Sequence, residues 1–304
     1  HSRPLDRVLR EVFGLSWAEA RGAIRSGKVF VGARPEELSC WTEEQRPVPK
    51  GGTIAIRPEA PRPKVQRRDA FEDARLLFLD GAVVVVDKPA GMSTIPFGDE
   101  PEDGTLAALL RDVLKTKLRG RARGMAPLGV VHRLDKDTSG AIVFARTVEA
   151  KKALADQFRS HSITRRYLAV VHGLISAPRT IRSHLVADRG DGIRGSARHK
   201  SQGGQLAITH VEPLELLGNA TLVACRLETG RTHQIRVHLA EAGHPIVGER
   251  VYMRGYRGQR LDAPRQMLHA AQLGFEHPVE GEPMDFEAPI PPDFEQRLAR
   301  LRTR

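Results

Sequence analysis

The chain has 304 residues, of which 40% are hydrophobic and 28% charged, a composition typical of a globular protein and unlike a disordered tail, a collagen or a coiled coil. Lys and Arg number 48 against 37 Asp and Glu, and most of the cations are Arg. The net charge of +11 indicates a polyanionic partner, with nucleic acid the first candidate, although a solvated basic surface is the alternative.

Residues 3–57 are predicted to form a small unit of two helices followed by short strands. Apolar residues between 5 and 12 recur at helical spacing, and Gly14 ends that helix. Ser16 can cap a second helix that continues to Gly27, and residues 29–31 and 53–56 have the composition of strands.

Two sequence patterns suggest nucleotide or metal chemistry, and neither is complete. Residues 22–29, GAIRSGKV, imitate a phosphate-binding loop, but Val29 stands where magnesium needs a hydroxyl and a helix precedes the segment. We therefore interpret Gly27 as a helix C-cap. His233 and His238 are five residues apart, off the i, i+4 spacing of a helical metal site, so no metal site is expected.

A segment rich in proline and arginine, residues 58–72, is predicted to link the amino-terminal unit (1–57) to a larger domain (73–304). Beyond it, predicted strands at 76–79 and 82–86 flank Asp80 and Gly81, a pair typical of a tight hairpin turn with positive φ. Helical periodicity covers 104–118, and the cation-rich residues 115–123 are predicted to form a loop.

In the rest of the larger domain, segments with strand periodicity and segments with helix periodicity follow one another in no regular order. Strand-like runs occur at 141–145, 166–171, 205–211 and 221–227, and helical patterns at 148–160 and 232–242. Because strands outnumber helices without regular βαβ alternation, we expect an α+β fold: a larger domain with a central, mostly antiparallel mixed sheet and flanking helices, plus the small α+β amino-terminal module.

Two cation-rich turns stand out in this domain. Asp135 lies in VVHRLDKDTSG (130–140), where an apolar strand-like run enters a polar turn. Each part has a structural explanation, with Asp as a turn residue, hydroxyls as caps and Gly140 as a hinge. A second such turn, GRTHQIRVH (230–238), opens a predicted helix.

With DKPAG (87–91), RYLAVVHG (166–173) and LHA (268–270), these motifs closely resemble the RluA-type RNA pseudouridine synthases. They occur in that family's order over roughly residues 73–290, and several long motifs in register are far more specific than any one of them. The resemblance implies that the N-glycosidic bond of a uridine in RNA is broken and the uracil rejoined through carbon 5. Nothing leaves and no redox step occurs, so no cofactor or metal is implied.

The resemblance assigns three catalytic residues: Asp135 as the carboxylate, Arg236 as its guanidinium partner and Tyr167 as an aromatic that stacks on the target base. A guanidinium beside the carboxylate favours its charged form in a closed pocket. Whether the carboxylate adds to the base or the ribose, or removes a ribose proton, stays open. Without the motifs, Arg236 is a helix-face cation and Tyr167 a strand aromatic; His132 and His269 are interpreted as structural histidines.

Uridine in folded RNA is stacked, so the enzyme is expected to flip it out of the stack. By resemblance, Arg133 is the side chain that enters the vacated space. Lys88 and Arg231 are expected to face the RNA backbone, and Leu268 to form a wall of the base pocket.

The amino-terminal unit resembles the alpha-L RNA-binding module of ribosomal proteins. The two helices followed by GKVFV (27–31) carry this resemblance, whereas VGAR (31–34) replaces the module's usual VNGK. Its phosphate contacts would come from cations that could equally lie on a solvated helix face, namely Arg7, Arg10, Arg21, Arg25 and Lys28.

We therefore expect an RNA pseudouridine synthase that acts on ribosomal RNA rather than transfer RNA, because such a module accompanies large-subunit ribosomal RNA enzymes more often. A transfer RNA synthase and an RNA-binding or folding protein without catalysis are the alternatives. No apolar run approaches the roughly 18 residues of a membrane span, and Cys40 and Cys225 form no disulfide framework. A cytoplasmic monomer with no membrane contact and no obligate protein partner is expected.

Overall fold

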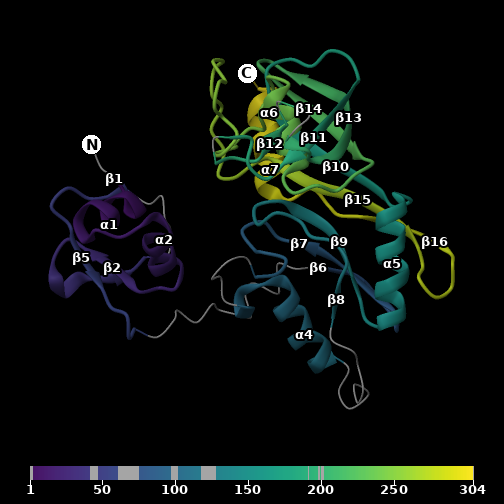
Figure 1. Ribbon diagram of the computed structural model, residues 1–304. Helices are drawn as coiled ribbons and strands as arrows, with labels where there is room; N and C mark the ends of the chain where they lie inside the picture. The colour runs from purple at the N-terminus through teal and green to yellow at the C-terminus, as the bar shows by residue number, and fades with distance from the viewer. Residues whose placement is uncertain are drawn as a thin grey trace.

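The computed structural model describes residues 3–41, 47–60, 75–96, 102–117, 128–190, 192–197, 199 and 202–303 (Figure 1). The predicted linker beyond residue 60, and residues 118–123 of the predicted cationic loop, lie outside these ranges. Residues 115–117 are the last turn of a helix.

Two helices and a three-stranded sheet form the amino-terminal unit. Helices α1 (Leu5–Phe13) and α2 (Trp17–Arg25) share a core with a sheet of order β3 (Ser39–Cys40), β2 (Val29–Gly32) and β5 (Thr53–Ile56). Strand β1 (Arg3–Pro4) pairs with β4 (Pro47–Val48), and a 3-10 turn, η1, covers Pro35–Glu37.

The predicted helix ends of this unit are confirmed. Gly14 has φ 67° and its N–H donates to Arg10, so a left-handed residue ends α1. Ser16 and Glu19 cap α2 reciprocally, each side chain bonding to the other's backbone N–H. Gly27 has φ 71°, which makes GAIRSGKV a helix end rather than a phosphate-binding loop.

An 11-stranded sheet organises the larger unit. Its order is β12 (Gly195–Ser196), β11 (Arg179–Val186), β13 (Gln205–Leu217), β14 (Ala220–Leu227), β10 (Thr164–His172), β15 (Leu268–Glu276), β9 (Ser139–Ala145), β7 (Val83–Lys88) and β6 (Arg75–Leu79). Strand β16 (Pro283–Glu287) pairs with β15, and β8 (Gly129–Val130) with β9. Only β15 and β9 pair in parallel among the described strands, so the mostly antiparallel mixed sheet is confirmed.

Helices cover both faces of this sheet. Alternate residues of β7 enter two different cores: Val84 and Val86 belong to the cluster that includes α4 (Leu106–Lys117) and α7 (Pro292–Arg302), whereas Val83 and Val85 pack with α5 (Val148–Ser160). A strand buried on both faces explains the unbroken apolar run. A 3-10 turn, η2 (Glu102–Gly104), precedes α4, and α6 (Gln234–Glu241) contacts β13.

Two local predictions were wrong. The hairpin between β6 and β7 exists, but Gly81 does not have a positive φ. Instead the Asp80 carboxylate closes the turn by accepting from the N–H groups of Ala82 (2.8 Å) and Val83 (2.7 Å). The helix predicted from residue 232 begins only at 234, because His233 has a left-handed φ of 58°.

Candidate active site

A loop between β8 and β9 carries Asp135. The backbone of the preceding residue, Leu134, is held on both sides by the Thr94 hydroxyl, which accepts from its N–H (3.1 Å) and donates to its carbonyl (3.0 Å). After the carboxylate, Thr138 N–H donates to the carbonyl of Asp135 at 3.1 Å. Hydrogen bonds on both sides of Asp135 thus fix its backbone independently of its side-chain contacts.

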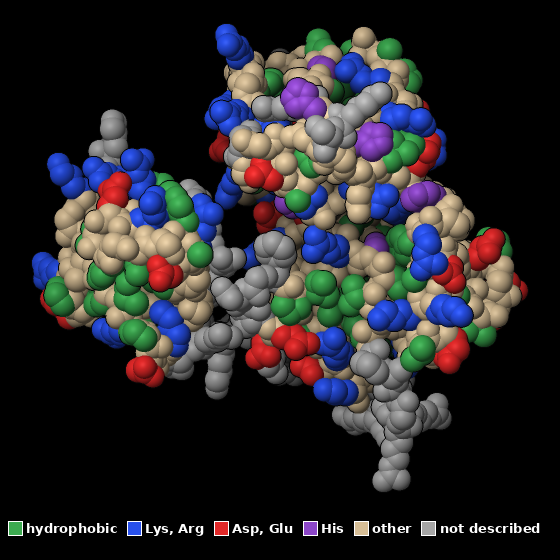
Figure 2. Space-filling view, viewed as in Figure 1, with side chains coloured by type: hydrophobic (Ala, Val, Ile, Leu, Met, Phe, Trp, Pro, Cys, Tyr) green, Lys and Arg blue, Asp and Glu red, His purple; other side chains and the backbone are tan. Residues whose placement is uncertain are grey.

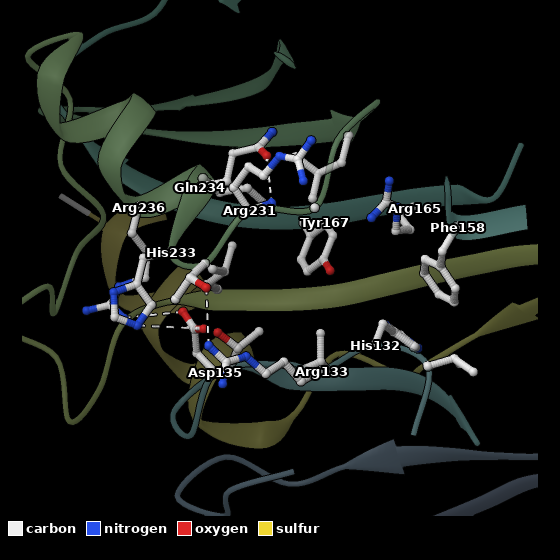
Figure 3. Close-up of a pocket in the computed structure, with 18 of the residues that line it drawn as sticks. His132, Arg133, Asp135, Phe158, Arg165, Tyr167, Arg231, His233, Gln234 and Arg236 are labelled. Atoms are coloured by element: carbon white, nitrogen blue, oxygen red, sulfur yellow. Dashed lines mark hydrogen bonds and ion pairs between the residues drawn. The ribbon is translucent and has the colours of Figure 1, made fainter. Parts of the chain in front are cut away.

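The turn before α6 is held by one buried amide, that of Gln234. Its oxygen accepts from the Thr229 hydroxyl (2.8 Å) and the Arg231 N–H (3.0 Å), and its nitrogen donates to the carbonyl of Ile208 (3.0 Å). This clamp fixes the conformation in which His233 is left-handed, an uncommon state for a residue with a Cβ. The clamp aims the side chains of His233 and Arg236 toward Asp135 (Figure 3).

Arg236 bridges two carboxylates. Nη1 donates to Asp135 Oδ2 at 3.2 Å, while Nε and Nη2 donate to Glu249 at 2.7 and 2.8 Å. Burial opposes the charge on Arg236, but the bonds and charges of Glu249 and Asp135 raise its pKa. Burial also opposes the charge on Glu249, and Arg236 with backbone N–H groups nevertheless lowers its pKa. The guanidinium is therefore permanently charged and held by a two-point fork.

His233 is a second neighbour of Asp135. Its Nε2 lies 3.8 Å from Asp135 Oδ1, and its Nδ1 lies 2.7 Å from the Tyr252 hydroxyl. Burial lowers the pKa of His233 and raises that of Tyr252 to about 12, so both are neutral near pH 7. The tautomer with its proton on Nε2 fits both neighbours. It turns an N–H rather than a lone pair toward the Asp135 carboxylate, and its Nδ1 accepts from the Tyr252 hydroxyl.

Asp135, His233 and Arg236 line one cleft of about 360 Å³. Figure 3 shows Asp135, Arg236 and His233 at one end, Arg165 and Phe158 at the other, and the Tyr167 ring between them. Burial, with smaller effects of Arg165 and Asp135, raises the pKa of Tyr167 to about 12.

The other expected RNA-facing residues lie mostly around this cleft. Arg133 is exposed at its edge and donates to the Thr232 hydroxyl at 3.2 Å. Arg231 is half-buried with Nε donating to the Leu206 carbonyl (3.0 Å), and Leu268 lies in the wall. The structure thus brings together six residues expected from the sequence: Asp135, Arg236, Tyr167, Arg133, Arg231 and Leu268.

The prediction that Lys88 faces the RNA backbone was wrong. Its side chain is fully buried, and Nζ donates to the carbonyls of Pro89 (2.9 Å), Met92 (2.7 Å) and Lys136 (3.0 Å). Burial lowers the pKa of Lys88 to about 7, against the nearby carboxylates of Asp137 and Asp135. Lys88 ties its own loop to the residue after Asp135.

Nearby histidines have structural partners. His132 Nε2 accepts from the Val143 N–H at 3.2 Å, and burial, with the charge of Arg165, lowers its pKa to about 3. The buried His269 bonds to the Ser139 hydroxyl (2.9 Å) and the Ala288 carbonyl (3.1 Å). Across the described ranges, no three His, Cys, Asp or Glu side chains are grouped as they would be in a metal site.

In the amino-terminal unit, the expected phosphate contacts have partners within the chain. Arg7 pairs with Glu11 at 3.0 Å, and Arg21 with the buried Asp6 at 3.2 Å. The guanidinium of Arg10 lies 4.2 Å from the centre of the Trp17 ring, and Lys28 bonds to the carbonyl of Ala60. The Arg25 side chain is outside the described part of the structure.

Comparison with known proteins identifies the family. A family model described as RNA pseudouridylate synthase matches residues 82–241. The chain belongs to the RNA pseudouridylate synthase family. The synthase is 43% identical over 226 residues to ribosomal large subunit pseudouridine synthase D of Zymomonas mobilis, covering 72% of this chain and 70% of that one.

Two further comparisons extend the likeness. The enzyme of the same name from Xanthomonas campestris is 36% identical over 323 residues and covers 99% of the synthase and 89% of its own length. The solved structure of human RNA pseudouridylate synthase domain containing 4 matches with a TM-score of 0.63 and 25% identity, over 78% of this chain and 96% of that one. The synthase is therefore an isomerase of uridine in RNA, and no helix in its described part is long and apolar enough to cross a membrane.

Sequence reasoning missed the residues that orient the site. His233 lies within the motif GRTHQIRVH, and Glu249 and Tyr252 lie beyond its end, in turns that show no periodicity from which partners could be predicted. The signal that could have found them is chemical. A glutamate and a tyrosine follow a helix that carries an arginine and has a histidine at its start, and these side chains can pair.

Proposed function

We propose that this synthase converts uridines of large-subunit ribosomal RNA to pseudouridine with Asp135 as the catalytic carboxylate. The observation that carries the proposal is the Asp135 side chain, 22% exposed in the cleft, bonded to Arg236 and facing the same space as Tyr167. The relatives from Zymomonas mobilis and Xanthomonas campestris are named as ribosomal large subunit enzymes, which supports that RNA as substrate.

The chemistry needs few groups. The bond between ribose C1′ and uracil N1 breaks, a bond between C1′ and C5 forms, and the proton on C5 is exchanged for one on N1. An ionised Asp135 can add to the base or the ribose or remove a ribose proton, and Arg236 keeps that carboxylate charged and aimed. Tyr167 offers a neutral ring for stacking, because its pKa is raised to about 12 by burial.

RNA binding extends beyond the cleft in this proposal. Lys and Arg side chains are scattered over the viewed face in Figure 2, in line with the net charge of +11. Arg133 at the cleft edge would fill the space left by the flipped uridine. The unit formed by residues 1–57 would dock structured RNA as an alpha-L module, joined by the segment 58–72 to the catalytic domain, 73–304. Its exposed Arg7–Glu11 pair is of the kind that costs little to exchange for a phosphate contact.

Release of tritium from RNA labelled at uridine C5 tests the catalytic role. The wild type should release tritium from large-subunit ribosomal RNA, whereas Asp135→Asn, nearly isosteric but unable to act as nucleophile or base, should bind the RNA and release none. Turnover of Asp135→Asn within tenfold of the wild type would refute the assignment. Binding without release by the wild type on any cellular RNA would favour an RNA-binding protein instead.

The substrate is tested separately. Pseudouridines mapped in total RNA from a deletion strain should be missing from large-subunit ribosomal RNA and restored by the wild-type gene but not by Asp135→Asn. Loss from transfer RNA alone would replace ribosomal RNA as the substrate and leave the catalytic role intact.

A further inference from the structure

The cleft has a second half that the chemistry at Asp135 does not use. Beyond Tyr167 its walls include His132, Phe158 and Arg165. Figure 3 shows Arg165 and Phe158 on the side of the Tyr167 ring away from Arg236. A uridine placed against Asp135 and Tyr167 would leave this half open to the rest of the RNA strand.

Arg165 is a buried cation without a counter-charge. Its side chain is only 6% exposed, yet within the described ranges no carboxylate lies within ion-pair distance of it. Nη2 donates to the Glu228 carbonyl at 2.9 Å, while Nε is buried and makes no hydrogen bond. Burial and the charge of Arg231 lower the pKa of Arg165, so both disfavour the charged form of its guanidinium. Such donors are normally paired.

The surroundings make space for this side chain and keep it positive. A Cβ on Gly230 would come 2.5 Å from Arg165 Nη1, so any other residue there would displace the guanidinium. The guanidinium carbon lies 5.6 Å from the centre of the Phe158 ring, which supports one of its sides. The cleft as a whole is lined by five arginines and one carboxylate, and that carboxylate, Asp135, is already bonded to Arg236.

We infer that Arg165 binds a backbone phosphodiester of the RNA substrate, adjacent to the uridine that is isomerised. This inference rests on the proposed function, since it takes the nucleotide at Asp135 to be part of an RNA strand. A phosphodiester supplies both the missing charge and acceptors for Nε and Nη1, in the planar geometry that guanidinium recognises. A uracil carbonyl is neutral and would leave the charge unbalanced. The phosphate would hold the strand so that the base reaches Tyr167.

The test uses an RNA fragment that the wild type modifies, bearing a single neutral methylphosphonate at the phosphate 5′ or 3′ of the target uridine. For the wild type, one of the two replacements should weaken binding about tenfold. Arg165→Gln should bind the unmodified RNA about tenfold more weakly, with a salt dependence reduced by about one phosphate contact, and should be insensitive to that same replacement.

The neighbouring residue provides a matched control. Arg166 carries the same charge on the same strand, but adjacent strand residues point to opposite faces, and Arg166 is absent from the cleft lining. Arg166→Gln should keep the sensitivity to the methylphosphonate. Arg165→Lys retains the charge and should keep most of the salt dependence, which answers the objection that Arg165→Gln only disturbs the fold.

The inference would be overturned if Arg165→Gln and the methylphosphonate weakened RNA binding independently, so that their effects on affinity multiplied, both at the phosphate 5′ and at the phosphate 3′ of the target uridine. A salt dependence that Arg165→Gln leaves unchanged would also overturn it. Failure of the wild type to act on ribosomal RNA would count against the proposed substrate only, because the comparison of variants is made on whichever RNA the wild type modifies.

Discussion

Replacing Glu249 by Gln tests whether the catalytic carboxylate depends on a residue that never touches it. The Glu249 carboxylate is fully buried and accepts from Arg236 Nε and Nη2 and from the N–H groups of Arg250 (3.0 Å) and Val251 (2.9 Å). A glutamine of the same shape would turn an NH2 group toward one of these donors and would remove one of the two carboxylate charges beside the guanidinium. Arg236 would then lose the two-point fork that fixes its orientation toward Asp135.

The structure sets the size of the effect. Breaking a buried ion pair costs about 3–5 kcal/mol, and each kcal/mol lowers Tm by about 2–4 °C in a domain of this size, so Glu249→Gln should melt about 6–20 °C lower. Misaiming Arg236 should lower the single-turnover rate at saturating RNA about 10- to 100-fold. The affinity for RNA should stay within about threefold, because Glu249 does not line the cleft.

A double-mutant cycle separates positioning from stability. If Glu249 acts only through Arg236, Glu249→Gln should cause no further loss of rate in an Arg236→Ala background. The exposed Glu212→Gln serves as the control and should change neither Tm nor rate. A rate that stays within threefold of the wild type while Tm falls, or losses that multiply in the double variant, would refute the positioning role.

Three further changes test other contacts. Arg236→Lys keeps the charge but not the fork, so the single-turnover rate should fall about 100-fold with little change in RNA affinity; full recovery at saturating RNA would contradict this. Lys88→Met removes the donor from three carbonyls and should cost about 1–3 kcal/mol in urea unfolding, with an unchanged salt dependence of RNA binding. Burial raises the pKa of Asp87 from 3.8 to about 6, so its charge destabilises the fold increasingly as pH rises from 4 to 6. Asp87→Asn should therefore be about 1–3 kcal/mol more stable than the wild type at pH 7.5 but not at pH 4; an equal difference at both pH values would argue against it.

The parts of the fold that sequence could predict are those with strong local signals. Periodicity found α1, α4 and α5, and Ser16 and Gly14 marked helix ends. Strand β11 was missed because its less exposed face also carries polar residues, Arg179 and Ser183, which break the alternation of apolar and polar residues that indicates a half-buried strand. Helix α7 was missed although its signal was present, with a proline at its start and Phe294, Leu298 and Leu301 at helical spacing.

The site divides in the same way. The resemblance brought Asp135 and Arg236 together across 101 residues, and the structure gives them a direct contact. It failed at Lys88, because a lysine is almost always exposed and one of the three carbonyls that hold it, that of Lys136, lies 48 residues further along the chain. Glu249 accepts from backbone N–H groups of its own turn, but only tertiary packing gives it the Arg236 guanidinium as a charge partner.

The position of β15 in the sheet has a consequence for when the synthase becomes active during its own translation. Strands β6 to β9, with the Asp135 loop, and strands β10 to β14, with Tyr167, are made first, but β15 lies between the two groups and joins them through β9 and β10. The two halves of the cleft therefore have no shared sheet until residues 268–270 have left the ribosome. A nascent chain therefore cannot hold the Asp135 loop and Tyr167 on one sheet before β15 has been made.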